Sequence, residues 1–376
     1  MQNAKPNILF VCPLPPPVHG SSMVSNYIKE STLINEEFCL DFVNLSTSRK
    51  MSEIGKFSIV KILRFLASYL LLLWKLTTHR YDLVYMATTV HGTGFLKDFP
   101  YMLMARLFCR HRVIHQHNKG MANYVDKSLY RCLLKWAYKD ANVMLLSDRL
   151  YEDIRSIVSS DKIMICPNGL PPIDDKNVIE KKYTDKPSLL YLSNLITSKG
   201  IFILLDACKV LKERGYRFSC NFVGGETKEV TRDIFENEIS QRDIQDFVHY
   251  IGPKYGNEKE KYWDCADIFV FPTYYYNECF PLVILEAMQH SVPIVSSNEG
   301  GIADIIQDGL NGYIINTDAL IDKKSAGTAL ADKLEVLLKD ASLREQMGRR
   351  SRELYEEKFT LQKFEERFVE CIKQCL

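Results

Sequence analysis

Short runs of β-branched and other apolar residues alternate along the first half of the chain with longer segments of mixed polarity. The short runs predict β-strands, at residues 8–12, 40–45, 83–86, 113–116, 143–146 and 163–166. The segments between them are long enough for helices, including 22–31, 57–77, 97–108 and 128–139. This alternation predicts a parallel, doubly wound sheet, because each helix carries the chain back across the sheet before the next strand.

The same alternation returns after a break in the pattern. Residues 166–172 are rich in proline, and residues 174–186 are polar and charged, which is the composition of a linker. Beyond it, strands are predicted at 189–192, 219–223, 249–251, 268–271, 294–296 and 313–315, with helices such as 201–214 and 259–265. The tail from 341 to 376 predicts two amphipathic helices. We therefore expect two α/β domains, 1–172 and 187–357, that face each other across a cleft.

The composition is that of a globular protein with two domains of ordinary size. A length of 376 residues exceeds what one core usually organises, and 46% hydrophobic with 25% charged residues excludes disordered and fibrous classes. A formal net charge of +1 gives no general attraction to nucleic acid, so we expect no such partner. The 11 cysteines lack metal-site spacing, which favours reduced thiols in a cytoplasmic protein without a bound metal. The first apolar run is too short for a signal peptide, so we do not expect secretion.

The apolar segment 57–76 raises the question of a membrane. A bilayer span needs about 20 apolar residues, and Lys61 and Arg64 interrupt this segment early, so we do not expect a crossing. The pattern instead predicts a helix that is partly buried and partly interfacial, peripheral on the inner face of the membrane. The cations that would meet anionic lipid are Lys56, Lys61, Arg64, Lys75 and Arg80. The alternative is a core helix whose cationic side chains reach solvent.

Two carboxylates, Glu278 and Glu286, flank the start of a predicted helix in the second half. Pro281 is tolerated only near a first helical turn, so the helix should begin beside it. The N–H groups of residues 282–284 would then lack partners within the helix, and the helix dipole would favour an anion such as a diphosphate there. The segment therefore combines donors for phosphate with acceptors for hydroxyl groups. The alternative is a surface acid with a helical salt bridge.

A resemblance to a known family rests on this motif and its neighbours. The E-x7-E spacing, with Phe-Pro-Leu at 280–282 and Glu-Ala-Met at 286–288, is similar to the motif of retaining glycosyltransferases of family 4, which have the GT-B fold. The strand and turn at 267–273, and the glycine pair and closing turn within 299–312, resemble the flanking segments of that family. The similarity implies two Rossmann-like domains, with the last helix, 360–376, packing back on the first.

Two further matches lie in the first half. The loop 13–23 places Gly20 immediately before a helix capped by Ser21 or Ser22, where the backbone can approach a phosphate closely. It resembles the glycine-containing loop of family 4, with one glycine where many members have two. His115 and His117 end a predicted strand and point to the same face. The resemblance gives His117 the place of the histidine that contacts the transferred sugar, with His115 as the alternative or a core histidine.

Another match follows the strand at 189–192. Lys199-Gly200 resembles the end of the family's G-R-L-x3-KG element, whose lysine neutralises the diphosphate leaving group. Asn194 stands where the family commonly has arginine, so half of the usual cationic clamp is absent.

The resemblance implies a metal-independent, retaining enzyme of the hexosyltransferase type that needs no cofactor, because Lys199 and the helix dipole replace a divalent ion. Its donor, a UDP- or GDP-sugar, should lie mainly on the second domain, with Glu286 at the ribose and Glu278 at the sugar. The residues assigned to donor binding are Gly20, Asn194, Lys199, Phe280, Leu282, Val283 and Glu286, and the catalytic residues are His117 and Glu278.

The sequence leaves more than one possibility open for the acceptor and for the reaction. A cytoplasmic enzyme with an apolar, basic N-terminal helix suggests a saccharide acceptor linked to lipid, in the synthesis of a cell-envelope polysaccharide such as capsule or lipopolysaccharide. A nucleotide-sugar 2-epimerase would use a similar fold, and a catalytically inactive binding partner is compatible with Asn194. An NAD-dependent dehydrogenase is not supported, because no G-x-G-x-x-G follows the first strand.

Overall fold

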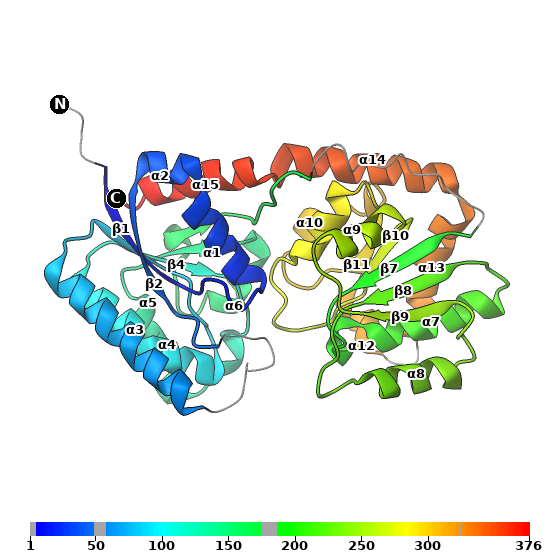
Figure 1. Cartoon of the computed structure of the whole chain (residues 1–376), viewed down its shortest axis with the longest axis horizontal. Coiled ribbons are helices and arrows are strands. Elements are labelled where there is room, and N and C mark those ends of the chain that lie inside the picture. Colours follow the sequence, from blue (N-terminus) through cyan, green and yellow to red (C-terminus); the bar gives the residue numbers. More distant parts are fainter. Residues whose placement is uncertain (1–4, 49–57, 174–185, 323–324) are drawn as a thin grey trace. The chain divides into compact units, whose positions relative to one another are not determined.

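The computed structural model describes residues 5–48, 58–173, 186–322 and 325–376. Lys56 and the greater part of the predicted linker, 174–185, lie outside the described residues. The chain divides into unit 1, which consists of Met1–Asn168 and Leu361–Leu376, and unit 2, which is Gly169–Thr360. Each unit contains one parallel sheet of six strands with helices on both faces (Figure 1). The predicted doubly wound α/β architecture is therefore confirmed.

All six strands predicted for the first half are present in unit 1. They are β1 (Asn7–Cys12), β2 (Cys39–Asn44), β3 (Leu83–Met86), β4 (Arg112–Gln116), β5 (Asn142–Leu145) and β6 (Ile163–Ile165), in the order β2-β1-β3-β4-β5-β6. The helices of this unit are α1 (Gly20–Glu30), α2 (Thr32–Glu37), α3 (Ile59–Thr78), α4 (Gly92–Phe108), α5 (Ser128–Tyr138), α6 (Tyr151–Ile154) and α15 (Leu361–Lys373).

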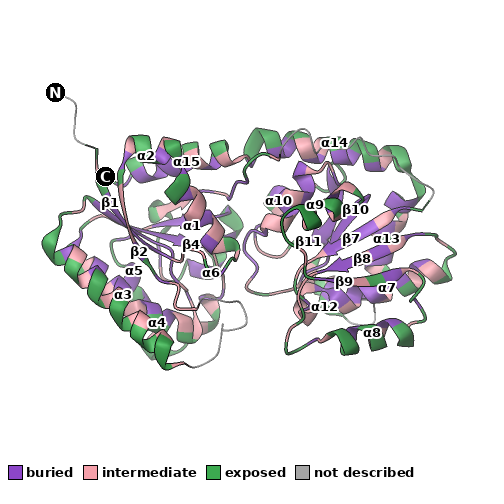
Figure 2. Cartoon of the chain, viewed as in Figure 1, coloured by how far each residue is buried: buried purple, intermediate pink, exposed green. Residues whose placement is uncertain are grey.

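One face of the unit 1 sheet shares its core with α1, α2 and α15. Ile8 and Phe10, alternate residues of β1, lie in a buried cluster with Ile28 of α1 and Phe368 of α15. The rings of Phe10 and Phe368 are stacked, with centroids 6.3 Å apart. Figure 2 shows the central strands β1, β3, β4 and β5 largely buried and the outer faces of the helices exposed. The last helix therefore completes the core of unit 1, although it follows the whole of unit 2 in sequence.

Unit 2 repeats this architecture with the remaining strands. They are β7 (Ser188–Leu192), β8 (Ser219–Val223), β9 (Val248–Gly252), β10 (Ile268–Phe271), β11 (Ile294–Ser297) and β12 (Gly312–Ile315), in the order β12-β11-β10-β7-β8-β9. The helices are α7 (Ile201–Glu213), α8 (Arg232–Gln241), α9 (Asn257–Asp264), α10 (Leu282–Gln289), α11 (Ile302–Ile305), α12 (Thr317–Ile321), α13 (Ala326–Lys339) and α14 (Ala341–Lys358). The two predicted amphipathic tail helices are thus α14 and α15.

Helix α3 is covered on one side only. Its Leu72 and Leu76 are buried, whereas Leu66 and Leu70 are 47% and 62% exposed. A wholly buried core helix, the alternative allowed by the sequence, is therefore wrong for this segment. Among the helices that the structure describes, none combines the length and the apolar character that a bilayer crossing requires.

Candidate functional site

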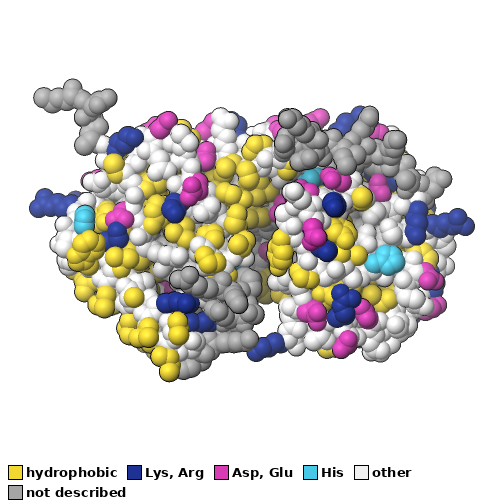
Figure 3. Space-filling view, in the orientation of Figure 1, with side chains coloured by type: hydrophobic (Ala, Val, Ile, Leu, Met, Phe, Trp, Pro, Cys, Tyr) yellow, Lys and Arg dark blue, Asp and Glu magenta, His cyan; other side chains and the backbone are white. Residues whose placement is uncertain are grey.

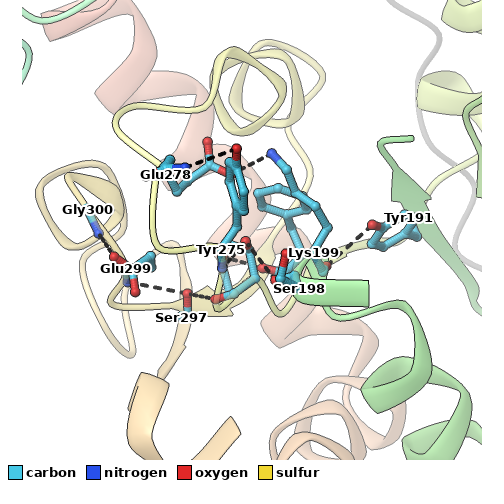
Figure 4. Close-up of polar contacts among 12 residues, drawn as sticks. Tyr191, Ser198, Lys199, Tyr275, Glu278, Ser297, Glu299 and Gly300 are labelled. Carbon is cyan, nitrogen blue, oxygen red and sulfur yellow. Dashed lines mark hydrogen bonds and ion pairs between the residues drawn. The ribbon is translucent and has the colours of Figure 1, made fainter. Parts of the chain in front are cut away.

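The strand order of each sheet reverses at one point, and loops meet there at the carboxyl ends of the strands. In unit 2 the reversal lies between the paired parallel strands β7 and β10. The strands that follow β7 are added on one side of this pair, and those that follow β10 are added on the other side. Open α/β sheets bind ligands in the crevice at such a switch point. The loop after β7 carries Lys199, and the loop after β10 carries Glu278 (Figure 4).

Lys199 and Glu278 form an ion pair at this switch point. The Lys199 Nζ lies 2.7 Å from the Glu278 Oε2, and their side chains are only 17% and 10% exposed. The ammonium group also lies 5.3 Å from the ring centroid of Phe271 and 5.1 Å from that of Tyr275. Both rings attract the ammonium group at this range, and so they help to hold it beside Glu278. The assigned phosphate cation and the assigned sugar-binding acid are therefore adjacent.

Backbone contacts hold the Lys199 loop against the turn that follows β10. The Tyr274 N–H donates to the Ser198 carbonyl at 2.8 Å. Gly200 has φ +83°, and a Cβ there would lie 2.1 Å from the Pro272 carbonyl oxygen. Both the left-handed backbone and this close approach require glycine. Glycine is therefore needed directly after Lys199, because it lets the loop after β7 lie against the loop that carries Glu278.

A second glycine turn supports Glu278 from the β11 side. Gly300 has φ +57°, and a Cβ there would lie 2.3 Å from the Glu278 carbonyl oxygen. The next N–H, of Gly301, donates to the Cys279 carbonyl at 2.7 Å. The Ser297 hydroxyl donates to the Thr273 carbonyl at 2.5 Å. The turn that carries Glu278 is therefore held between two glycine turns, one after β7 and one after β11 (Figure 4).

Helix α10 begins at Leu282, directly after Pro281, as the sequence predicted. The N–H groups of Leu282 and Val283 have no hydrogen-bond acceptor within the part of the chain that the structure describes. The Ile284 N–H donates to the Pro281 carbonyl at 3.1 Å, so the prediction of a third free donor at this residue was wrong. Two unpaired N–H groups and the positive end of the helix dipole remain available for an anion.

The second acid of the motif, Glu286, is oriented by two donors on α9. Its Oε1 lies 2.9 Å from the Lys259 Nζ, and its Oε2 accepts from the Trp263 Nε1–H at 3.3 Å. A carboxylate has about four acceptor positions, so positions remain for ribose hydroxyls. Sequence reasoning missed Lys259 and Trp263. One feature of the sequence could have indicated them, because residues 259 and 263 are four positions apart and so lie on one face of the predicted helix at 259–265.

Asn194 and Phe280, which the sequence analysis assigned to donor binding, have contacts within the protein. The Asn194 Oδ1 accepts from the Gly225 N–H at 3.1 Å, which joins the loops after β7 and β8. The Phe280 ring is buried and lies 5.8 Å, between centroids, from the ring of Phe359. The side chain of Phe280 therefore packs in the interior. The Gly224-Gly225 pair at this loop was also missed.

A cavity of about 470 Å³ lies at the carboxyl ends of the strands of unit 1. It surrounds the point between β1 and β3 where the order of this sheet reverses. Its walls include His19, Ser21, Thr88, Lys97, Asp98 and His117. We refer to it as the carboxyl-end cavity.

The two histidines of β4 and its following loop have different environments. His117 lines the carboxyl-end cavity, and its Nε2 has no hydrogen-bond partner among the described residues. Burial, with a smaller contribution from the charge of His19, lowers the pKa of His117 to about 4. His115 is fully buried, its Nδ1 lies 2.8 Å from the Tyr85 hydroxyl, and burial holds its pKa well below the usual value. His117 therefore presents a neutral imidazole to the cavity near pH 7, while His115 is part of the core.

The loop after β1 reaches the same cavity in a different way from the one predicted. Gly20 is the first residue of α1, and the N-cap is His19, whose Nδ1 accepts from the Ser22 N–H at 3.3 Å. The Ser22 hydroxyl in turn accepts from the His19 N–H at 3.0 Å. The prediction that Ser21 or Ser22 caps this helix was therefore wrong. A histidine cap is rare enough that residue preference did not indicate it.

Asp98 of α4 was missed by sequence reasoning. It is 2% exposed, its Oδ2 accepts from the Thr89 N–H at 2.9 Å, and its Oδ1 lies 3.1 Å from the Lys97 Nζ. A buried carboxylate on a cavity wall can accept from a ligand hydroxyl. Within the described ranges, no group of three His, Cys, Asp or Glu side chains could hold a metal ion.

Comparison with known proteins places these features in a family context. Residues 172–354 match the family model described as Glycosyl transferases group 1. The capsular polysaccharide biosynthesis glycosyltransferase CapM of Staphylococcus aureus is 29% identical over 196 residues, which are 50% of this chain and 47% of CapM. The chain thus spans about half the length of this curated relative.

Solved structures match along almost the whole chain. Sucrose-phosphate synthase from Thermosynechococcus elongatus matches with a TM-score of 0.75 and 17% identity, over 98% of this chain and 99% of that one. Anabaena HepE, solved in complex with UDP and glucose, matches with a TM-score of 0.69 and 16% identity, over 98% and 99% of the two chains. At these identities the likeness concerns the fold. It confirms the predicted GT-B fold class.

Proposed function

We propose that this chain is a retaining glycosyltransferase of family 4, because residues 172–354 match the family model described as Glycosyl transferases group 1. In the proposed reaction an acceptor oxygen forms a bond to the anomeric carbon of the donor sugar. The bond between that carbon and the diphosphate oxygen breaks, and the acceptor proton passes to the leaving phosphate. The observation that carries the proposal is the Lys199–Glu278 pair beside the free N–H groups at the start of α10.

The leaving diphosphate needs positive charge, and two features of unit 2 supply it. The Lys199 ammonium group is one, and the N–H groups of Leu282 and Val283 at the start of α10 are the other. A diphosphate oxygen that approaches Lys199 competes with the Glu278 carboxylate for the same ammonium group. Glu278 is then freed to accept from a hydroxyl of the sugar. With these charges in place we propose that transfer needs neither a metal nor a cofactor.

The donor is proposed to be a UDP- or GDP-sugar whose ribose hydroxyls donate to Glu286. Lys259 and Trp263 hold that carboxylate in one orientation, which lowers the entropy lost when a ribose binds. Anabaena HepE, which shares the fold, was solved with UDP and glucose, and this supports a nucleotide-sugar as the donor class. Asn194 lies at the same end of the sheet and is proposed to contact the donor, although its Oδ1 already accepts from Gly225.

The acceptor is proposed to be a saccharide linked to lipid, in the synthesis of a capsule or a similar cell-envelope polysaccharide. The name of CapM, which refers to capsular polysaccharide biosynthesis, supports the synthesis of such a polysaccharide. The carboxyl-end cavity of unit 1 offers acceptors and donors suited to sugar hydroxyls, including Asp98, Thr88 and the neutral His117. The role of His117 and of the Gly20 loop at the transferred sugar stays a prediction.

We further propose that the protein works at the surface of an anionic membrane, with α3 as the contact. The exposed apolar side chains of α3 are Ile59, Val60, Ile62, Leu63, Leu66, Leu70, Leu71 and Trp74. Figure 3 shows hydrophobic side chains gathered over this helix. An apolar helix face of this length with basic neighbours is typical of interfacial binding. Lys75, one of the predicted lipid contacts, instead pairs with Asp41 at 2.5 Å, so the apolar face carries more of the proposed contact.

A panel of UDP- and GDP-sugars tests the proposed reaction most directly. Slow release of free sugar from one donor, without acceptor, is the result expected of a transferase. Interconversion of two nucleotide-sugars would instead show a 2-epimerase, and neither reaction nor binding would show an inactive partner. The Glu278→Ala variant serves as the control, because loss of this carboxylate should abolish release without preventing nucleotide binding.

A further inference from the structure

A second cavity of about 470 Å³ lies at the opposite end of the unit 1 sheet, and we refer to it as the basic cavity. Arg112 and Asn142, the first residues of β4 and β5, contribute to its wall, as does Lys162, directly before β6. These are the amino ends of parallel strands, whereas the carboxyl-end cavity lies at their other ends. The basic cavity is therefore separate from the site that the proposed function uses in this unit.

The wall of the basic cavity is strongly positive. It is lined by Arg106, Cys109, Arg110, His111, Arg112, Asp140, Asn142 and Lys162, which amount to four permanent cations and one carboxylate. None of the four cations takes part in an ion pair among the described residues. Cations elsewhere in unit 1 do, as Lys75 with Asp41 and Lys373 with Glu37 show. Charge of one sign gathered in a recess raises the local concentration of anions.

Arg112 is the buried member of this group. It is 4% exposed, its Nη1 donates to the Ala137 carbonyl at 3.2 Å, and its Nη2 donates to the Lys139 carbonyl. The Nε has no hydrogen-bond partner in the described structure. Burial, and then the charge of Arg106, lowers the pKa of the guanidinium. Burial of this charge costs free energy, and an anion bound in the cavity would offset part of that cost.

Arg106 is also held by contacts with α5. Its Nη1 donates to the Trp136 carbonyl at 2.6 Å, and its guanidinium carbon lies 4.1 Å from the centroid of the Trp136 ring. Both arginines therefore bind carbonyls at the end of α5, which is a structural role that fixes the position of their guanidinium groups. That role does not account for Arg110 and Lys162, which are exposed on the same wall. Two fixed guanidinium groups beside two exposed cations are suited to a phosphate group.

From this arrangement we propose that the basic cavity is a binding site for a phosphate-bearing anion, with Arg110 and Lys162 as the residues that close on it. The phosphate can belong to a soluble phosphate ester or to the headgroup of an anionic lipid. Leu107 and Phe108, at the end of α4 beside Arg110, are 68% and 48% exposed, so an amphiphile would find apolar side chains next to the cations.

The first test measures binding of inorganic pyrophosphate by calorimetry at constant ionic strength. It uses the full chain with Lys199→Ala, which removes the proposed diphosphate cation of unit 2 and leaves unit 1 unchanged. Adding Arg110→Glu and Lys162→Glu should weaken the remaining binding by at least about tenfold, because charge-assisted hydrogen bonds are lost and repulsion replaces them. Both residues are exposed, so folding should persist, and circular dichroism checks this. The matched control adds Lys29→Glu and Lys135→Glu, two exposed lysines of unit 1, and should bind as before.

The second test separates the two sources of phosphate. Sedimentation with phosphatidylglycerol vesicles that falls in the Arg110→Glu, Lys162→Glu protein and is reduced by pyrophosphate supports the site with a lipid headgroup. Pyrophosphate binding that depends on these residues, with unchanged sedimentation, supports the site with a soluble phosphate ester. Two results together would overturn the proposal. Pyrophosphate binding would be absent, or equal in the charge-reversal and control proteins, and vesicle sedimentation of these two proteins would also be equal.

Discussion

The Nζ of Lys199 lies 2.7 Å from the Oε2 of Glu278, although the two residues are 79 positions apart in sequence. The strands before them, β7 and β10, are neighbours in the sheet, and their loops leave the same edge. The close approach at Gly200 joins these two loops, and Gly300 and Ser297 hold the loop after β10 against the end of β11 and its following turn. The pair is therefore a property of the sheet order, and it places a cation and an acid where a diphosphate and its sugar are proposed to bind.

Lys199→Ala should lower the turnover of donor hydrolysis by about 10²-fold or more, because one preorganised donor to developing charge typically contributes about 3 kcal/mol. Steady-state kinetics with the best donor of the panel provides the measurement. Lys209→Ala, a change in an exposed lysine of the same unit, is the control and should leave turnover as it was. A parent enzyme that works only with Mg²⁺, or a fully active Lys199→Ala protein, would contradict the proposed role of the lysine.

Glu286→Ala should weaken nucleotide binding, whereas Glu278→Ala should mainly lower turnover. Glu286 is proposed to meet the ribose in both the ground state and the transition state, while Glu278 meets the reacting sugar. Calorimetric binding of UDP and GDP, together with turnover, resolves the two effects. Lys259→Met removes the cation that orients Glu286 and should shift nucleotide affinity in the same direction. Equal losses of affinity with unchanged turnover in both acid variants would refute the division of roles.

Gly200→Ala should destabilise unit 2 and reduce activity, because its Cβ would lie 2.1 Å from the Pro272 carbonyl in addition to the strain of φ +83°. Gly215 supplies a matched control, since it has φ +82° and nothing within 4 Å of a Cβ. Gly215→Ala should therefore show the left-handed backbone cost alone, about 1–2 kcal/mol. The measurement is thermal or urea unfolding of both variants. Equal stability of the two proteins would show that the loops do not need the close approach.

The stability of the protein should fall as the pH is lowered from about 6.5 to about 4, and His117 should contribute to that fall. The pKa of His117 is lowered from 6.5 to about 4 in the folded chain. The unfolded chain therefore binds a proton in this window that the folded chain does not, so stability decreases as the pH falls. Below about pH 4 the contribution no longer changes.

Unfolding midpoints across this window test the point with His117→Gln, which removes the titrating group and keeps a polar side chain. The slope with pH should be smaller in the variant than in the parent. His19 and His115 also have lowered pKa values and titrate in both proteins, so the expected result is a reduced slope and not a flat one. Identical slopes would mean that His117 is not buried as described.

The protein should sediment with anionic vesicles, and the exposed face of α3 should be required. The double variant Leu66→Ser, Leu70→Ser changes two residues that are 47% and 62% exposed, so folding should be retained while lipid binding falls. Each basic residue near an anionic surface contributes about 1 kcal/mol, so binding should also weaken as salt rises. Ser replacement at Leu129, which is exposed on α5, is the control. Lack of sedimentation at low salt would rule out the membrane proposal.

Local pattern was sufficient for the elements of this fold. Alternation of apolar runs with longer segments located all twelve strands that the structure describes. Most of these strands are buried by helices on both faces, so they read as continuous apolar runs. The start of α10 beside Pro281 followed from the chemistry of proline alone. The proximity of Gly20, His117, Lys199 and Glu278 to the carboxyl ends of strands was likewise predictable, because parallel sheets place the following loops at one edge.

Tertiary structure decided the contacts that depend on which loops and helices become neighbours. The partners of Glu286, the ion pair of Glu278 and the place of α15 in the core of unit 1 all join residues far apart in sequence. The His19 cap and the Ile284 hydrogen bond are local contacts, and there the geometry of a single turn overrode residue preference. Hydrophobic periodicity reports which side of an element is buried. It carries no information on which other element buries it, because the hydrophobic effect is non-directional and the partner is selected only when the whole core packs.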